Sequence, residues 1–360
     1  MPRLRLACYN IAWFSRLFDQ HNRLVDDLEW SALYNISRRR QAAAIAEVLS
    51  RVDADCFAIV EAPNNGHRQS TVAQLERFAA HFGLRQRAAL IGFANPTDQE
   101  IALLFDPDRI SAEHAPIGEL LGEAMAESGE LPFGSPRFDG VFPADLDGDG
   151  TIERHHFSKP PLEAVVTDLA TGESFRMISV HLKSKSPRGA GSPAQARRRG
   201  LENRAKQYAQ AVWLRTRLEE HMAAGEDVIV LGDFNDGPGF DKLERVNGRS
   251  SVDLVIGNSA RPDTLLASSF AGQGTTSDRA RPSTARFYDD RTRVYLNALI
   301  DFIMLTPSLA ARAQPSWRIW HPFEDAKCFD DESLREALKD ASDHFPVSVD
   351  LEMKAATEGR

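Results

Sequence analysis

Residues 228–236 have the sequence VIVLGDFND, in which four apolar residues are followed at once by polar ones. A short run of Val, Ile and Leu predicts a buried strand. Gly232 allows the chain to leave that strand by a tight turn, so that Asp233 and Asn235 can reach the same space. We therefore expect a strand of a central sheet whose end carries reactive groups. The alternative is an Asx-turn that only closes the strand.

Five other apolar runs end on polar side chains in the same way. They are LACYNIAWF (6–14), CFAIVEAPN (56–64), MISVHLKSK (177–185), NALIDFIML (297–305) and ASDHFPVSV (341–349). Strands that end like this deliver their polar groups to the rim of a sheet, here Asn10, Glu61, His181, Asp301, Asp343 and His344. Hard divalent cations choose carboxylate and amide oxygens as ligands. The pattern favours metal-assisted hydrolysis of a phosphate ester.

The chemistry of the residues suggests roles for them. Asp233 could polarise a water nucleophile, and Asn235 could hold a phosphoryl oxygen or a metal. His344 suits proton transfer near neutral pH and needs an orienting carboxylate, for which Asp301 is the natural partner because a buried carboxylate is costly unless paired.

Three further residues complete this set. His181 could bind the scissile phosphate or act as a second acid, and Lys183 could add positive charge beside it. Glu61 is the best single candidate for a metal ligand. For each, the alternative is a strand-end side chain satisfied by backbone or solvent.

The composition is that of an ordinary globular enzyme, with 360 residues of which 42% are hydrophobic and 26% charged. A net charge of −9 argues against a protein that coats nucleic acid, but not against a nuclease, because phosphate contacts are local. Cys8, Cys56 and Cys328 have no paired spacing and predict buried thiols in a reducing compartment. We read no signal peptide and no membrane span, so we expect a cytoplasmic protein.

Apolar periodicity predicts strand–helix units and strand pairs, which indicate a layered α/β fold in one domain over residues 1–353. The predicted helices are 37–51, 69–82, 201–221 and 239–246, and the predicted strands are 4–12, 55–61, 86–92, 100–105, 162–168, 175–181, 227–232, 294–305 and 345–352. Residues 111–160 predict a loop-rich elaboration, 183–200 a basic loop and 354–360 a disordered tail.

The order and spacing of the six motifs resemble the endonuclease/exonuclease/phosphatase superfamily, which has the deoxyribonuclease I-like fold. GDFN at 232–235 and SDHFPV at 342–347 carry most of the resemblance. It implies a four-layer α/β sandwich, with two mixed β-sheets packed face to face and helices outside. VEAPNNG at 60–66, ALLFDPDRI at 102–110 and HLKSK at 181–185 look more like the bacterial nuclease branch than the inositol phosphatase branch. KPPLEA at 159–164 looks like the substrate-side PPL segment of bacterial members.

The resemblance also implies roles for the site residues. It implies Mg²⁺ or Mn²⁺ bound by Glu61, with Asn10 and Asp343 nearby. It further implies His344 paired with Asp301, His181 as phosphate contact or acid, and Asp233 with Asn235 flanking the attacking water. Two positions depart from the family pattern: Val60 stands where many relatives have Gln, and Ala12 where some have Asp.

A second metal site is predicted at DLDGDGTIE, residues 145–153. Asp145, Asp147 and Asp149 followed by Gly150 match the start of a calcium-binding loop, which Glu153 could complete as a structural Ca²⁺ site. His156 occupies the position where a bidentate Glu is expected. The alternative is an acidic, solvated turn.

The predicted function is a divalent-metal phosphodiesterase acting on nucleic acid, most simply a DNA endonuclease. Basic residues in the loops around the site suggest a polyanionic substrate, and the alternative is that they are solvated charges of helices and loops. They are Arg38–Arg40, Lys183, Lys185, Arg188, Arg197–Arg199, Arg204, Arg279, Arg281, Arg286, Arg291 and Arg293. The alternatives are a phosphomonoesterase, a phospholipid or small-molecule phosphodiesterase of the same fold, and a non-catalytic binding module. No protein partner is implied.

Overall fold

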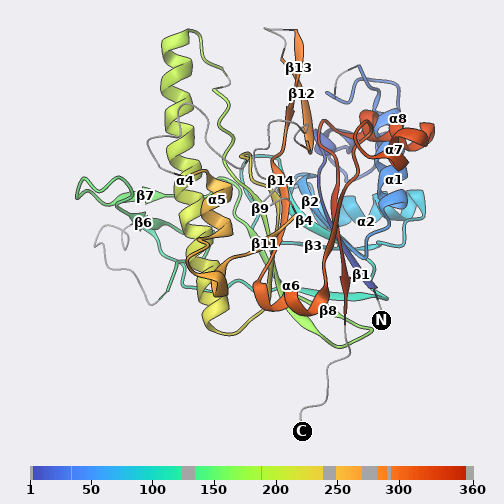
Figure 1. Cartoon of the computed structure of the whole chain (residues 1–360). Helices are drawn as coiled ribbons and strands as arrows, with labels where there is room; N and C mark the ends of the chain where they lie inside the picture. The colour runs from blue at the N-terminus through green and yellow to red at the C-terminus, as the bar shows by residue number, and fades with distance from the viewer. Residues whose placement is uncertain are drawn as a thin grey trace.

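Two large mixed β-sheets pack against each other and carry helices on their outer faces (Figure 1). The computed structural model describes residues 3–33, 35–123, 134–187, 189–237, 249–269, 282–289 and 293–353. The first sheet has the strand order β15 (Ser316–Ile319), β16 (Val347–Glu352), β1 (Arg3–Asn10), β2 (Cys56–Ala62), β4 (Glu100–Phe105) and β3 (Ala88–Ile91). The second has the order β11 (Ala267–Ser268), β14 (Asp301–Leu305), β10 (Val228–Asp233), β9 (Ser174–His181), β8 (Leu162–Asp168) and β5 (Ile110–His114).

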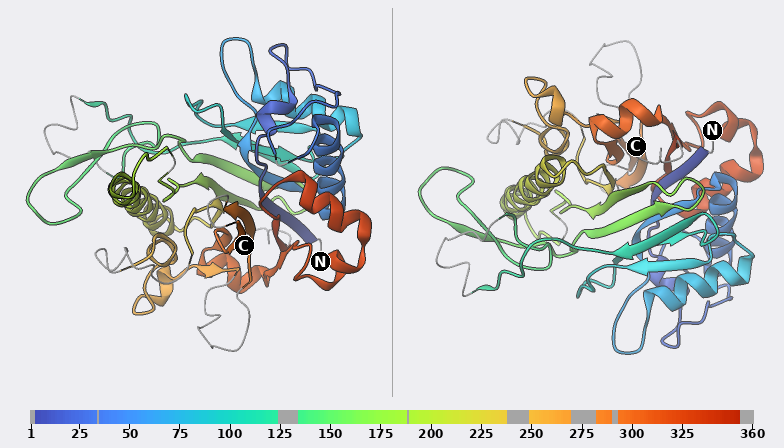
Figure 2. Two further views of the ribbon diagram at one scale, coloured as in Figure 1. Left: turned by 90° about the horizontal axis from the view of Figure 1, so that it is seen from above. Right: turned by 90° about the horizontal axis from the view of Figure 1, so that it is seen from below.

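Helices cover both outer faces, so that the molecule has four layers when the sheets are viewed edge-on (Figure 2). The first sheet is covered by α1 (Arg38–Val52), α2 (Thr71–Phe82), α7 (Ala326–Asp330) and α8 (Glu332–Ala341). The second is covered by α4 (Pro193–Ala223) and α5 (Ser251–Ile256). The remaining elements are α6 (Pro307–Ala313), the 3₁₀ turns η1 (Phe14–Leu17) and η3 (Pro262–Thr264), and the hairpins β6–β7 (Phe142–Ala144, Glu153–His155) and β12–β13 (Ala285–Asp289, Val294–Ala298).

Alternation along each strand divides the core between the layers. On β1, Leu6 and Cys8 point into the apolar layer between the sheets, whereas Ala7 and Tyr9 face the helices. This follows from the period of two in a strand. Burial of apolar groups on both faces explains why these strands are almost continuously hydrophobic. The predicted four-layer sandwich is confirmed.

The sheets share one edge at which β1, β2, β9 and β10 all end, which we call the active edge. β1 and β2 run parallel, as do β9 and β10, so their C-terminal ends point the same way. Arg3 pairs with Glu352, which places the start of β1 and the end of β16 at the opposite edge. The upper part of α4 and the β12–β13 hairpin extend beyond the active edge (Figure 1).

Several boundaries differ from the sequence prediction. The helix predicted from residue 201 begins at Pro193, because Ser192 caps it by accepting from the backbone N–H of Gln195, so residues 193–200 are not loop. The strand predicted over 294–305 is two strands, β13 and β14, and β5 at the start of segment 111–160 belongs to the second sheet. Helix α8 and strand β15 were not predicted. Residues 239–246 and 354–360 lie outside the described residues.

A buried ionic network fastens the C-terminal half of α4 to the second sheet. Arg217 and His221 are fully buried and both contact Glu163 on β8, at 2.7 Å from Nη1 and 2.6 Å from Nε2. Nδ1 of His221 bonds to Glu226. Because removing one partner of such a network leaves an uncompensated buried charge, it fixes α4 in place.

Gly232 has a conformation that other residues cannot adopt easily, with φ of 133°. A Cβ atom there would overlap the carbonyl oxygen of Val180 on the neighbouring strand. We expect Gly232→Ala to lower the free energy of unfolding by at least about 3 kcal/mol, from backbone strain plus overlap. Urea denaturation measures this. Gly225→Ala is the matched control, because Gly225 has φ of 75° and open space around it, and it should lose only about 1–2 kcal/mol. Equal losses would contradict the overlap.

None of the helices in the described ranges combines the length and the apolar character needed to cross a membrane.

Candidate active site

Three polar residues stand in one row at the active edge of the second sheet. Asp233 at the end of β10 pairs in register with His181 on β9 and with Asp301 on β14. Residues opposite each other on neighbouring strands point to the same face. Alternation from Leu231 and Ile303, which lie between the sheets, places this row on the inner face. All three side chains are buried.

Asn10 brings the first sheet into the same site. Its Nδ2 donates to Asp233 Oδ2 at 3.0 Å, so the ends of β1 and β10 are joined across the gap between the sheets. Asn235 approaches from the other side, with its backbone N–H 2.7 Å from Asp233 Oδ1 and its Nδ2 3.1 Å from Oδ2. Asn235 takes a left-handed conformation with φ of 50°. The Asx-turn is thus present, but it serves to orient Asp233.

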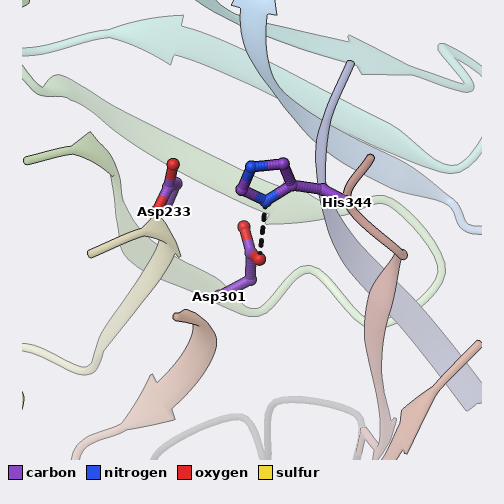
Figure 3. A group of neighbouring side chains, drawn as sticks. All are labelled: Asp233, Asp301 and His344. Carbon is purple, nitrogen blue, oxygen red and sulfur yellow. Dashed lines mark hydrogen bonds and ion pairs between the residues drawn. The ribbon is translucent and has the colours of Figure 1, made fainter. Parts of the chain in front are cut away.

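His344 lies over this row and bonds to Asp301, with 2.9 Å between Nδ1 and Oδ2 (Figure 3). The segment that carries it is held by backbone bonds from Arg286 to Asp343 and from Phe345 to Thr284. Although burial lowers the pKa of His344, Asp301, Asp233 and Asp343 outweigh this effect and raise it to about 10. His344 is therefore an imidazolium near neutral pH, with Nδ1 donating to Asp301.

Glu61 reaches the site through an irregularity in β2. The pairing of β2 with β4 shifts register between Val60 and Ala62, and Glu61 has φ of 57°. Phe57, Ile59 and Ala62 all face the helices, so the bulge turns Glu61 to the opposite, inner face. Its charge acts on Lys159 beside His181. Without the bulge, alternation would point Glu61 away from the site.

Lys159 and Gln99 belong to the site, and the sequence prediction missed both. Lys159 Nζ lies 3.0 Å from His181 Nδ1 and 2.5 Å from Gln99 Oε1. Burial lowers the pKa of Lys159, although Glu61 and Asp233 oppose this. Burial, Lys159 and His344 hold the pKa of His181 well below its usual range. His181 is therefore neutral and accepts from Lys159 at Nδ1, so its Nε2 carries a proton, 3.6 Å from Asp233 Oδ2.

The residues at the row fit a divalent cation. Carboxylate oxygens of Asp233 and Asp301 lie within 4.8 Å of each other and of a ring nitrogen of His344. Burial and the charge of Asp301 raise the pKa of Asp233 above its usual range, which reports carboxylates crowded in a poorly solvated space. The buried Oδ1 of Asn10 has no hydrogen-bond partner within the described part of the chain. An unpartnered amide oxygen among carboxylates is the donor set that Mg²⁺ or Mn²⁺ prefers.

Two predicted residues lie at the margin of this group. Asp343 is half-buried, and its charge acts on His344 and on Tyr9. Lys183 follows the end of β9, and its charge acts on His181 and Lys159. The assignment of Asn10, Glu61 and Asp343 as metal ligands, and of Lys183 as a phosphate contact, stays a prediction.

The acidic loop after β6 is exposed. Asp145, Asp147 and Asp149 bring carboxylate oxygens within 4.8 Å of one another, and Asp145 accepts from the backbone N–H groups of Gly148 and Gly150. Glu153, the fourth predicted ligand, lies 3.8 Å from His155 instead. We expect Ca²⁺ to raise the melting temperature of the native protein but not of Asp147→Ala. An unchanged melting temperature in the native protein would sink this site.

The basic loops are less available to a substrate than predicted. Arg38, Arg39 and Arg40 form ion pairs with Asp27, Asp26 and Asp340. Lys185 and Arg198 pair with Asp236 and Glu202. Arg286 stacks over the ring of Tyr295 at 4.1 Å. Arg188, Arg279, Arg281 and Arg291 lie outside the described residues.

The chain belongs to the endonuclease/exonuclease/phosphatase family, whose model matches residues 9–344. Members of this family are metal-dependent hydrolases of phosphoric esters. A comparison with curated proteins found no match.

Solved structures with the same architecture cover almost the whole chain. A family member from Bacteroides thetaiotaomicron aligns over 97% of this chain and 97% of its own, with TM-score 0.52 and 15% identity. A second, from Bacteroides vulgatus, covers 98% and 100%, with TM-score 0.50 and 16% identity. A mannosyl-6-phosphatase from B. thetaiotaomicron covers 97% and 100%, also with TM-score 0.50 and 16% identity. At these identities the likeness establishes the fold alone.

Proposed function

We propose that this protein is a divalent-metal-dependent phosphodiesterase that cleaves nucleic acid, with DNA as its substrate. The observation that carries the proposal is the buried row of Asp301, Asp233 and His181, with His344 and Asn10 against it, at the active edge. This arrangement supplies both proton-transfer groups and oxygen ligands around one point.

A diester is favoured over a monoester because two separate cavities each include a residue that lies next to the site. The α4 groove, of about 540 Å³, is lined by His156, Ser158, Lys183, Lys206 and Gln210 among others. The Trp13 cleft, of about 470 Å³, is lined by residues that include Trp13, Arg16, Arg38, Asn64, Gln69 and Gln99. Lys183 joins the first to the site, and Gln99, bonded to Lys159, joins the second. A diester places a group on each side of its phosphorus, whereas a monoester has one.

In the proposed mechanism the chain's own residues position a water and stabilise the phosphate. Asp233 takes the proton from the water whose oxygen attacks phosphorus, because the imidazolium of His344 has no free lone pair to accept it and the pKa of Asp233 is raised towards neutrality. As the new P–O bond forms, the bond to the leaving oxygen breaks, and that oxygen takes a proton from solvent. Asn235 orients this carboxylate. His181 donates from Nε2 to a phosphoryl oxygen, and Lys159 and His344 add positive charge. A cation held by Glu61, Asn10 and Asp343 would neutralise charge on the phosphoryl oxygens.

The test is incubation with supercoiled plasmid in Mg²⁺ or Mn²⁺, against EDTA and the Asp233→Asn variant. We expect metal-dependent nicking by the native protein, lost in EDTA and in the variant. Failure of the folded native protein to nick plasmid, a single-stranded oligonucleotide or RNA with either metal would overturn the proposal.

The second candidate is a phosphatase or phosphodiesterase for small molecules. The net charge of −9 and the pairing of Arg38–Arg40 with acidic residues favour it, because both reduce attraction for a long polyanion. Rates on p-nitrophenyl phosphate and on bis(p-nitrophenyl) phosphate discriminate: faster release from the monoester would move the function to this candidate.

A further inference from the structure

The Trp13 cleft opens beside the candidate active site and has no part in the mechanism above. Its lining comes from the segment after β1 that includes Trp13 and Asp19, with Val25, from Arg38 at the start of α1, from the loop after β2 with Asn64 and Gln69, and from the turn before β4 with Gln99. The segments after β1 and β2 follow the strands that carry Asn10 and Glu61. Because Gln99 also bonds to Lys159, which contacts His181, the cleft lies next to the place where His181 would hold a phosphate.

Trp13 lines this cleft in an unfavourable backbone conformation. It has φ of 63° and ψ of 22°, a left-handed conformation that is unfavourable for a bulky side chain. The turn is fixed from both sides, since Ala12 N donates to Ser342 Oγ and Gln41 Nε2 donates to Ala12 O. Phe14 next to it is fully buried, whereas 39% of Trp13 is exposed. The strain therefore exposes an indole at a site edge instead of packing it in the core.

The lining of the cleft is polar but electrically balanced. Arg16 and Arg38 are offset by Asp19 and Asp98 in the same lining. Arg38 and Asp19 also pair with other residues, Asp27 and Arg23. A balanced lining does not attract a second phosphate, so it suits an uncharged group. Asn64 Nδ2 donates to Gln69 Oε1 at 2.9 Å, so this bond does not use the Asn64 carbonyl, an acceptor, or the Gln69 amide nitrogen, a donor.

We propose that the Trp13 cleft binds the base of the nucleotide next to the scissile phosphate, with the base stacked on Trp13 and its edge bonded to Asn64 and Gln69. This inference rests on the proposed phosphodiesterase function. A ring that stacks on an aromatic side chain and bonds through donors and acceptors on its edge is the chemistry of a nucleobase. The volume of about 470 Å³ is within the range of small-ligand sites.

Binding of labelled single-stranded oligonucleotides by fluorescence anisotropy tests the proposal. All proteins carry Asp233→Asn to slow hydrolysis, and Mg²⁺ is present. The two probes are a thymine oligonucleotide and one of equal length with tetrahydrofuran in place of each base. We expect Trp13→Ala to weaken binding of the first roughly 5- to 150-fold and to leave binding of the second unchanged. Trp13→Phe should retain most of the affinity.

Trp30→Ala is the matched control, because Trp30 is 68% exposed in the same N-terminal segment and does not line the cleft. It should bind both oligonucleotides like the parent. Equal affinity of the parent for both probes, or an equal loss on both in Trp13→Ala, would overturn the proposal. So would displacement of the oligonucleotide by a hexose 6-phosphate but not by thymidine 5′-monophosphate. Hydrolysis by the native protein is measured separately, so its failure would be a failure of the proposed function alone.

Discussion

Replacement of His344 by alanine should lower turnover roughly 10²- to 10⁴-fold, the range expected for loss of one positioned proton-transfer or charged group. His344 is buried against Asp301 and Asp233 and carries a positive charge there. The variant removes the positive charge of His344 that would stabilise the phosphate, and it leaves Asp301 without its hydrogen-bond partner. Steady-state rates on bis(p-nitrophenyl) phosphate at saturating Mg²⁺ measure the effect. Turnover within a few-fold of the native protein would remove His344 from the mechanism.

The cost to stability should be about 3–5 kcal/mol, because the buried carboxylate of Asp301 is left without its partner. His221→Ala is the matched control. His221 is also fully buried between carboxylates, but it lies in the network under α4 and not at the active edge. It should lose about 3–5 kcal/mol of unfolding free energy while keeping near-native turnover. A large loss of turnover in His344→Ala but not in His221→Ala, with both variants less stable, would separate a catalytic histidine from a structural one.

Much of this site follows from one feature of the sequence, the polar residue at the end of an apolar run. Asp233 and His181 could each be placed at a strand end from residue types alone, whereas Asp301, which was expected inside one strand over 294–305, begins β14. Their position in one row depends on the register of β14, β10 and β9. The sequence of any one strand does not determine that register. Pairing partners depend on contacts between segments far apart in the chain, as with Asn10 and Asp233.

The residues that escaped prediction lack such a signal. Lys159 precedes two prolines before β8, and a lysine in a loop is ordinarily a solvated charge; only burial against His181 gives it a role. Gln99 is an amide in a turn. Trp13 and Glu61 both have positive φ, which neither residue type favours. These backbone conformations depend on the surrounding hydrogen bonds, which the local sequence does not reveal.

The bulge makes Glu61 the position where a small change should have a large effect on metal binding. Glu61→Gln keeps the size of the side chain and removes its charge. We expect the dissociation constant for Mg²⁺ or Mn²⁺ to rise at least about 10- to 100-fold, because even partners outside the ligand shell contribute that much at metal sites. Isothermal titration calorimetry measures the affinity directly. Catalytic efficiency at low Mg²⁺ should fall by a similar factor and recover partly as Mg²⁺ is raised.

Asp55→Asn is the matched control for this experiment, because Asp55 precedes the same strand at the opposite edge and is buried against Arg85, 2.9 Å away, and the backbone N–H of Arg5. It should lower the free energy of unfolding without changing metal affinity. Unchanged metal affinity in Glu61→Gln would show that Glu61 acts on Lys159 and does not bind the cation. The cation would then have to be held by Asp233 and Asp301, whose carboxylate oxygens lie within 4.8 Å of each other, together with Oδ1 of Asn10.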